Sequence, residues 1–380
     1  MLPVEFPIDK RCVSKGDSAP QNLYSTDTLC KDYLSPDQCQ TVTVSAHTGG
    51  IDVPSARFRI RQHITPLLRQ RINVKERYLR WGRNKPDQVT LQPLWIAATV
   101  SDRLFSIAAD RHADVTILQR QPLPAFLPVE PFIRHPIILD VDDAIWMNRG
   151  GKRAKIIAQK AVAVICGNRY LADYFRQFNK SIYVIPTAVD TNTIKPSIGS
   201  GPEKQVIGWI GSSENLKYLY YIEAALQEVL LRHNKAELLV VCNERPRFKR
   251  IAPNRVRFIP WSRESERKAF TEMTVGIMPL EDSEWERGKC SFKMLCYMAA
   301  GLPVIVSPVG MNREVLELGN VGTGPSTLDE WISAFDTVFN DPDLATKMGA
   351  AGRAVIMKNF CVDVISPQIA RIIHWAASYR

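Results

Sequence analysis

Short apolar runs alternate with segments of helical spacing along most of this chain. The runs are continuous rather than interrupted by polar residues, which is typical of parallel strands covered on both faces of a sheet. A segment from about Ser55 to Arg71 has helical periodicity. In the first half of the chain the pattern predicts strands at 41–47, 113–119, 136–142, 161–167 and 181–187.

The alternation restarts after a linker-like stretch, KPSIGSGPEK (195–204). Helices are expected from about Asn215, at 264–273 and from about Gly288. A last helix, from about Pro367, has isoleucines at helical spacing, and we expect it to pack back across the domain boundary. The predicted strands of this half are 205–211, 237–242, 256–261, 275–280 and 303–308.

The two halves predict an α/β fold of two Rossmann-like domains whose parallel sheets face each other across a cleft. The expected divisions are an irregular lead-in at 1–40, an N-terminal domain at 41–195, a C-terminal domain at 196–365 and a closing helix at 366–380. Ligands of open α/β sheets bind beyond the carboxyl ends of the strands. We therefore expect both domains to present their strand-end loops to the cleft.

Composition is that of a globular chain: 380 residues are enough for two domains, and 45% hydrophobic with 23% charged residues are ordinary values. The longest apolar runs are too short to span a bilayer, and the N-terminus lacks the apolar core of a signal peptide. Eight cysteines without CxxC spacing indicate reduced thiols and give little support to a zinc site. We therefore expect a cytoplasmic protein.

The net charge of +10 is concentrated in one place. Between Arg57 and Lys85 there are ten lysines and arginines and a single acid, Glu76. Such a run is often a solvated face, but leucines and Trp81 among the cations also suit a surface for anionic lipid headgroups. Nucleic acid is not expected as a partner, because no RNA-binding signature or zinc finger accompanies the charge.

Two loops have the composition of phosphate sites. In the first, Gly211, Ser212 and Ser213 end a predicted strand and lead into a helix with Lys217. In the second, Lys289 and Lys293 are expected four apart on one face of a helix, in its first turns. Cations are unfavourable at a helix N-terminus, and a bound diphosphate would reverse that penalty; two solvated lysines are the alternative.

The stretch GIMPLEDSEWERGKCSFKMLCYMAAGLPVIVSPVGMNREVL (276–316) resembles the C-terminal signature of group 1 nucleotide-sugar glycosyltransferases of the GT-B fold, which are similar to glycosyltransferase family 4. Further matches occur upstream in the order of that family, and together they cover roughly residues 41–375. They are segments 52–68, 114–124, 138–146, 165–175, 184–194, 207–212 and 259–270.

The resemblance implies transfer of a sugar, with retention, from a nucleotide-diphosphate donor on the C-terminal domain. No cofactor and no bound metal are implied. The acceptor, a glycan, a lipid-linked molecule or another hydroxyl compound, is expected on the N-terminal domain. The implied donor-binding residues are Gly211, Ser212, Ser213, Lys217, Trp261, Lys289, Cys290, Ser291, Lys293 and Glu314, and the acceptor-binding residues are Gly49, Gly50, Arg57 and Arg120. Trp261 is expected beside the nucleobase or, alternatively, in the core.

The chain departs from the family pattern at two glutamates, whose positions are occupied by Gly288 and Cys296. Glu284 and Glu286 are near but out of register, so they are poor substitutes. The arginine of an Arg–Lys phosphate pair is also missing. We expect Lys289 and Lys293 to supply the positive charge instead.

Asp140, Asp142 and Asp143 lie close together in DVDDAIW. A metal site, an acceptor-binding or general-base function, and loop capping are the alternatives. We favour Asp142 and Asp143 as catalytic carboxylates that accept a hydrogen bond from the acceptor hydroxyl. Arg57 and Arg120 are expected to hold an anionic acceptor or to pair with these aspartates. His47 is expected to face the cleft.

The expected function is glycosyl transfer, either free in the cytoplasm or at the inner membrane face. A nucleotide-sugar epimerase or a phosphorylase of the same plan is an alternative, and a phosphorylase would need a pyridoxal lysine and a longer chain. Another alternative is a non-catalytic sugar-binding or nucleotide-sugar-binding protein, suggested by the missing glutamates.

Overall fold

The computed structural model describes residues 40–51, 53–80, 86–120, 132–147, 151–196 and 205–379. Almost all of the expected lead-in lies outside these ranges. So do Arg83 and Lys85 of the basic run and most of the expected linker.

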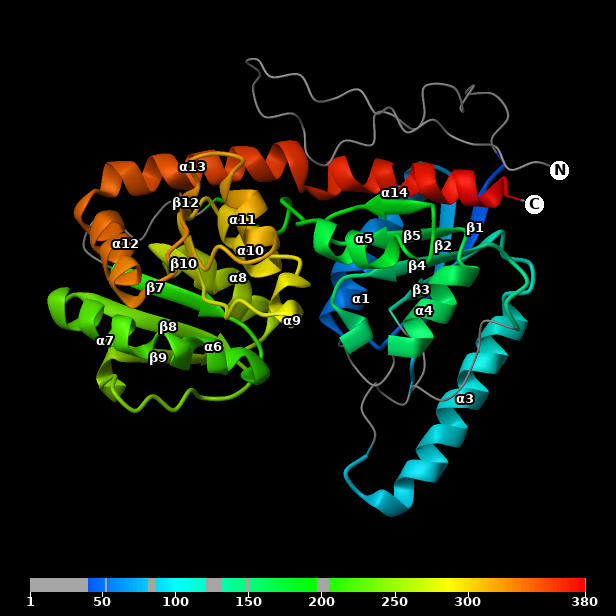
Figure 1. Ribbon diagram of the computed structural model, residues 1–380, viewed down its shortest axis with the longest axis horizontal. Coiled ribbons are helices and arrows are strands. Elements are labelled where there is room, and N and C mark those ends of the chain that lie inside the picture. The colour runs from blue at the N-terminus through cyan, green and yellow to red at the C-terminus, as the bar shows by residue number, and fades with distance from the viewer. Residues whose placement is uncertain are drawn as a thin grey trace.

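The first domain is a sheet of six parallel strands in the order β2-β1-β3-β4-β5-β6, covered by helices on both faces (Figure 1). Apolar residues of its central strands are buried, as the continuous runs predict. Its strands are β1 (Val42–Thr48), β2 (Ile72–Tyr78), β3 (Val115–Gln119), β4 (Ile137–Val141), β5 (Ala163–Cys166) and β6 (Ile182–Val184). Its helices are α1 (Pro54–Arg59), α2 (Ile64–Arg69), α3 (Gln92–Ala109), α4 (Gly151–Lys160) and α5 (Arg169–Phe175).

The second domain repeats the plan with strand order β12-β11-β10-β7-β8-β9, again parallel. Its strands are β7 (Gln205–Ile210), β8 (Ala236–Cys242), β9 (Val256–Pro260), β10 (Val275–Met278), β11 (Val304–Val306) and β12 (Gly322–Thr323). Its helices are α6 (Leu216–Tyr221), α7 (Glu223–Arg232), α8 (Arg263–Glu272), α9 (Glu284–Arg287), α10 (Phe292–Ala299), α11 (Met311–Leu316), α12 (Leu328–Asn340) and α13 (Pro342–Asn359).

The chain crosses between the domains a second time near its end. Helix α14 (Val362–Ala377) follows α13 and packs on α2 and on strands of the first sheet, so the two helices run along one side of both domains (Figure 1). At the crossing, Val189 and Cys361 form a parallel β-bridge. The chain therefore passes through neighbouring positions shortly before it leaves the first domain and when it returns to it.

The carboxyl ends of the two sheets meet at the domain boundary. One continuous cluster of buried apolar side chains includes Val141 and Cys166 of the first domain and Met294 of the second. The boundary also has polar contacts, described below, that join the ends of β4 and β5 to the loop between α9 and α10. The fold therefore brings the strand-end loops of both domains to one place.

Candidate functional site

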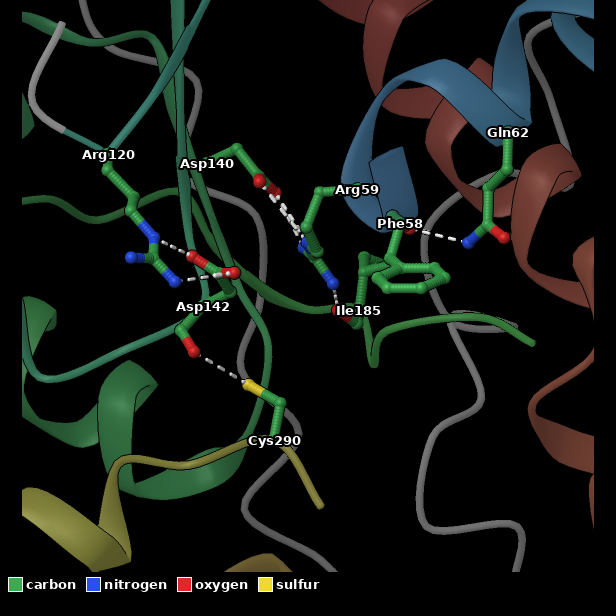
Figure 2. A network of polar contacts seen from close by, with 8 residues as sticks. All are labelled: Phe58, Arg59, Gln62, Arg120, Asp140, Asp142, Ile185 and Cys290. Carbon is green, nitrogen blue, oxygen red and sulfur yellow. Dashed lines mark hydrogen bonds and ion pairs between the residues drawn. The ribbon is translucent and has the colours of Figure 1, made fainter. Parts of the chain in front are cut away.

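Charged side chains meet where β3 and β4 end. Arg120 follows β3 in a left-handed backbone conformation, with φ of 55°. Its guanidinium donates to both carboxylate oxygens of Asp142, with Nη2 and Oδ2 2.9 Å apart, and to Asp143 Oδ2 at 2.5 Å. Figure 2 shows the Arg120–Asp142 pair. Of the two alternatives for Arg120, the structure contains the pairing with the aspartates.

A second and deeper pair lies beside the first. Arg59 ends α1 and donates to both oxygens of Asp140, with Nη2 and Oδ1 2.5 Å apart, and its Nη1 donates to the Ile185 carbonyl at 2.7 Å (Figure 2). Burial raises the pKa of Asp140, although Arg59 opposes the shift. We refer to these two arginines and three aspartates as the aspartate–arginine cluster, whose members are Arg59, Arg120, Asp140, Asp142 and Asp143.

Asp142 and Asp143 differ in their availability to a substrate. Burial alone would raise the pKa of Asp142, but the charge and hydrogen bonds of Arg120 outweigh burial and hold that pKa below its usual range. A carboxylate held in this way is a weak base. The Asp143 side chain is 21% exposed, against 9% for Asp142. Asp143 is therefore the better placed of the two to meet a hydroxyl group.

In the second domain, the loop after β7 lies close to Lys293. A Cβ added at Gly211 would be 2.9 Å from Lys293 Cε, so a side chain there would displace the lysine. Asn243, after β8, orients the loop: its Oδ1 accepts from the Ser213 N–H at 2.8 Å, and its Nδ2 donates to the Ser213 hydroxyl at 3.0 Å. The structure thus brings together the two loops that the sequence analysis identified as candidate phosphate-binding loops.

Three lysines gather around aromatic rings at this loop. The Nζ atoms of Lys217 and Lys289 lie 4.8 Å and 5.7 Å from the centre of the Tyr218 ring. The Nζ of Lys293 lies 5.4 Å from the Trp209 ring. Burial, and after it the charge of Lys289, lowers the pKa of Lys293 to about 7. We refer to Lys217, Lys289 and Lys293 as the lysine cluster.

Glu286 is the carboxylate in contact with the lysine cluster. It is 3% exposed, accepts hydrogen bonds from the hydroxyls of Tyr218 and Ser283, and has its Oε1 3.7 Å from Lys217 Nζ. Burial would raise the pKa of Glu286, but the two hydroxyls and Lys217 hold it below its usual range. The side chain of Glu284 is exposed instead. Of the two glutamates that are out of register, Glu286 lies at the site.

The expectation that Lys289 and Lys293 share the first turns of one helix is wrong. Helix α10 begins at Phe292, and Lys289 lies before it, with its N–H bonded to the Glu286 carbonyl at 3.0 Å. The reason is Ser291, whose left-handed backbone (φ of 51°) turns the chain just ahead of the helix.

A donor-binding residue would face the lysine cluster, but the side chain of Cys290 points to the first domain instead. Its thiol donates to the Asp142 carbonyl at 3.2 Å, across the domain boundary (Figure 2). Burial raises the pKa of this thiol well above its usual value. Cys290 is therefore a protonated contact between the domains.

The other donor candidates lie around the same edge of the second sheet. Trp261 follows β9 and is 45% exposed, which excludes a core position. Ser212 precedes the short 3-10 helix at 213–215. Glu314, in α11, lies across the boundary from the first domain, with its Oε2 3.9 Å from Arg169 Nε.

The remaining acceptor-binding candidates, Gly49, Gly50 and Arg57, do not lie together at the aspartate–arginine cluster. Gly49 and Gly50 follow β1, and the Gly50 carbonyl accepts from Arg61 Nη2 at 3.2 Å. Arg57 does not pair with the aspartates; its Nη1 lies 3.5 Å from Glu266 Oε2 in α8 of the second domain. Burial raises the pKa of Glu266 in spite of this arginine. Arg57 therefore bridges the domains.

His47 does not face the cleft, contrary to expectation. It is 1% exposed and contacts the Ser45 hydroxyl at 3.0 Å and Arg103 Nη1 at 2.9 Å. Burial, and then the charge of Arg103, lowers its pKa to about 3, so the ring is neutral at ordinary pH. Arg103 also donates to the Thr48 carbonyl at 2.9 Å, which makes this network the anchor of α3 on the sheet.

The basic run from Arg57 to Lys85 is not a single solvated face. Among its described members, Arg69 and Lys75 are exposed, while Ile72 and Val74 of β2 are buried. Several of its described cations form ion pairs with carboxylates. These pairs are Arg57–Glu266, Arg59–Asp140, Arg61–Glu76, Arg77–Asp110 and Arg80–Asp102.

Within the described ranges, no group of three or more histidine, cysteine, aspartate or glutamate side chains is arranged to hold a metal ion. The three aspartates of DVDDAIW are instead paired with arginines. In the same part of the chain, none of the helices combines the length and the apolar character that a bilayer crossing requires.

Several residues of the site were not expected from the sequence. Arg59 was one cation in a run, and Tyr218 was one aromatic in a helix. Asn168 precedes a helix, as a capping residue does, but its contacts with the second domain have no local signal. The usable signal was a capping asparagine at the carboxyl end of a buried strand.

Residues 204–341 match the family model for Glycosyl transferases group 1. A search of curated proteins finds no match to this chain. Solved structures similar to the chain include sucrose-phosphate synthase from Thermosynechococcus elongatus, with a TM-score of 0.67 and 14% identity over 89% of this chain and 100% of that one.

Two further structures show the same likeness. Anabaena HepE in complex with UDP-glucose has a TM-score of 0.65 and 15% identity, over 88% of this chain and 99% of that one. WaaG, a glycosyltransferase involved in lipopolysaccharide biosynthesis, has a TM-score of 0.59 and 11% identity, over 87% and 99%.

At these identities the likeness of the solved structures is one of fold, and the family match lies in the second domain. Together they confirm the resemblance inferred from the sequence: the chain has the GT-B fold, with a second domain of the group 1 glycosyl transferase type.

Proposed function

We propose that this glycosyltransferase takes its sugar from a nucleotide-diphosphate donor whose phosphates bind the lysine cluster. The observation that carries the proposal is the gathering of three lysine side chains at the Gly211 loop, with one carboxylate, Glu286, in contact with Lys217. Like charges held together are unfavourable unless an anion binds among them. HepE, a structure of the same fold, was solved with UDP-glucose.

The transfer requires no metal in this proposal. A leaving diphosphate develops negative charge, and ammonium groups can stabilise that charge in place of a cation. Loss of the sugar's bond to the diphosphate would be balanced by its bond to the acceptor oxygen, whose proton goes to solvent or to a carboxylate. Retention of configuration is part of the proposal, as the resemblance implies.

The acceptor is proposed to bind at the aspartate–arginine cluster. Asp143 is the carboxylate that would accept a hydrogen bond from the acceptor hydroxyl, while Asp142 holds Arg120. Trp261, exposed at the end of β9, would stack on the nucleobase.

A nucleotide screen tests the donor proposal. UDP, GDP, ADP and the matching nucleosides would be compared by thermal shift and calorimetry, because a ligand that binds the folded chain raises its melting temperature. We expect at least one diphosphate to bind and its nucleoside to bind far more weakly. Equal binding of the diphosphate and its nucleoside would show that the phosphates do not bind the lysine cluster.

Hydrolysis of the matching nucleotide sugar, without acceptor, then separates an enzyme from a binding protein. A transferase releases some free sugar by attack of water, and a non-catalytic protein releases none. The same assay with chelator tests metal independence, and we expect no loss of activity.

A lipid-linked acceptor at an anionic membrane is the proposed partner. Helix α3 extends away from the first domain (Figure 1). Arg69 and Lys75 are exposed on this domain, and Leu94 and Phe105 of α3 are 69% and 72% exposed. The spacing of eleven residues puts these two side chains on one helical face. Exposed cations and exposed apolar residues on the same domain suit lipid headgroups and the acyl boundary.

Vesicle co-sedimentation tests the membrane proposal. Binding should increase with anionic lipid, decrease at high salt, and weaken in Leu94→Ser with Phe105→Ser and in Arg69→Ser with Lys75→Ser. Leu231→Ser is the matched control, since Leu231 is 69% exposed on the second domain. No sedimentation at low salt on strongly anionic vesicles would refute the membrane partner.

A further inference from the structure

Asn168 is a first-domain side chain with contacts in both domains. It is fully buried and precedes α5. Its Oδ1 accepts from the Leu171 N–H at 2.9 Å, which caps the helix. Its Nδ2 donates to the carbonyls of Lys289 at 3.0 Å and of Arg287 at 3.3 Å, both in the second domain. The amide therefore has its acceptor satisfied in one domain and its donor in the other.

The two carbonyls belong to the segment that sets the position of a cluster lysine. Arg287 ends α9, where helix carbonyls have no partner in the helix itself. The backbone of Lys289 is held on both sides, since its N–H donates to Glu286 and its carbonyl accepts from Asn168. The Lys289 side chain starts from this fixed backbone and reaches Tyr218.

Two glycines, Gly167 and Gly288, let the same segment pack directly against the first domain. A Cβ at Gly167, next to Asn168, would lie 2.2 Å from Cys290 Sγ. A Cβ at Gly288 would lie 2.8 Å from the Cβ of Ala144. With the thiol bond from Cys290 to the Asp142 carbonyl, these contacts surround Asn168 on the boundary. The chain itself connects the two domains near Val189 and near Cys361. Asn168 links them by hydrogen bonds.

We propose that Asn168 is a positioning residue that shapes segment 287–290 from the first domain, so that Lys289 grips the donor diphosphate fully only when the two domains are together. The proposal rests on the proposed function, because it takes the lysine cluster as the diphosphate site. It adds that acceptor-domain contacts set donor affinity.

Two variants isolate the amide donor. Asn168→Asp keeps an oxygen to cap α5 but faces the two carbonyls with a second oxygen. Asn168→Ser also keeps a good capping residue, and it removes the amide N–H groups that reach the two carbonyls without adding charge. Asp341→Ser is the matched control, because Asp341 caps α13 by accepting from the Leu344 N–H at 2.9 Å, on the second domain.

The first measurement is amide hydrogen exchange of the full chain without nucleotide. We expect faster exchange in peptides spanning 286–291 in both Asn168 variants, little change in α5, and no change in this segment in Asp341→Ser. Unchanged exchange in 286–291 in both Asn168 variants overturns the proposal.

The second measurement is calorimetric affinity for UDP, GDP and ADP beside their nucleosides. We expect about a tenfold loss of diphosphate affinity in Asn168→Ser, as for one weakened charged contact, and no loss for nucleoside. Equal losses for both ligands overturn the positioning of Lys289. If the parent chain binds no diphosphate, the proposed function fails, and the exchange result still decides whether Asn168 holds the segment.

Discussion

The aspartate–arginine cluster and the lysine cluster lie on either side of the same boundary, and they treat charge in opposite ways. In the first, two arginines are matched by three aspartates at hydrogen-bond distance. In the second, three lysines gather with Glu286 as the one carboxylate within ion-pair distance among the described residues. The paired charges of the aspartate–arginine cluster hold its side chains in fixed positions. The lysine cluster has more cations than carboxylates, so it can bind an anion. The following experiments test that contrast.

The largest effect is expected on stability, at Arg59. Changing Arg59→Met leaves Asp140 buried without its cation, and breaking a buried pair in this way costs about 3–5 kcal/mol. Urea unfolding would measure the change. The double variant Arg59→Met with Asp140→Leu should recover most of it, since a buried pair can be replaced by apolar groups. Arg69→Met, at an exposed cation, is the control. If Arg59→Met alone is as stable as the parent, Arg59 does not neutralise a buried charge on Asp140.

The next effect is expected on turnover, at the carboxylates. Asp143→Asn should slow sugar transfer by about 100-fold or more, the usual range for loss of a general base or orienting carboxylate, with donor affinity nearly unchanged. Asp142→Asn should also slow transfer, through the release of Arg120. Turnover and nucleotide affinity, measured together, check the split. A loss that added metal restores would point to a metal site in DVDDAIW.

Replacing a cluster lysine should have a smaller effect, and on binding. Lys289→Ala or Lys293→Ala should weaken nucleoside diphosphate binding by about 1.5–3 kcal/mol, as for a lost charged hydrogen bond. The melting temperature should hold or rise, because like charges are being removed from one another. Lys235→Ala, at an exposed lysine after α7, serves as the control. If nucleoside binding falls by the same amount, the lysines do not contact phosphate.

The smallest effect is a pH dependence that belongs to Lys293. Its pKa is about 7 in the folded chain, so the free ammonium is largely deprotonated at pH 8, and an anion must restore its proton. Diphosphate affinity should therefore decline from pH 7.5 to 9.5, by up to about tenfold per unit. The unfolded lysine keeps its proton to about pH 10.5, so this group makes the free protein more stable as pH rises from 7 to 10.5. Calorimetry across the range checks this, and Lys293→Met should remove the slope.

Continuous apolar runs were enough to predict most of the strands, because a parallel sheet buries both faces of its central members. Two strands were not expected: β2, at 72–78, and the two-residue β12, at 322–323. Both lie at the edge of a sheet. In β2, buried Ile72 and Val74 alternate with exposed residues such as Lys75, so the strand has no continuous apolar run.

The meeting of the strand-end loops, where the candidate site lies, could also be predicted, because the ends of parallel strands lie at one edge of a sheet. Its pairings could not. Arg59 is 81 positions from Asp140, and Asn168 is 121 positions from Lys289, so only the packed domains determine them. His47 was misplaced because its position at a strand end says nothing of the buried Arg103 that packs beside it.

Helix α14 also affects the order in which the chain can fold. Its apolar side chains, among them Ile365, Ile369 and Ile373, belong to the same buried cluster as Val44 and Ile117 of the first sheet. A ribosome makes these residues only after the whole second domain. The core begun first is therefore the one completed last, and the nascent first domain must keep an apolar surface open throughout the synthesis of its neighbour.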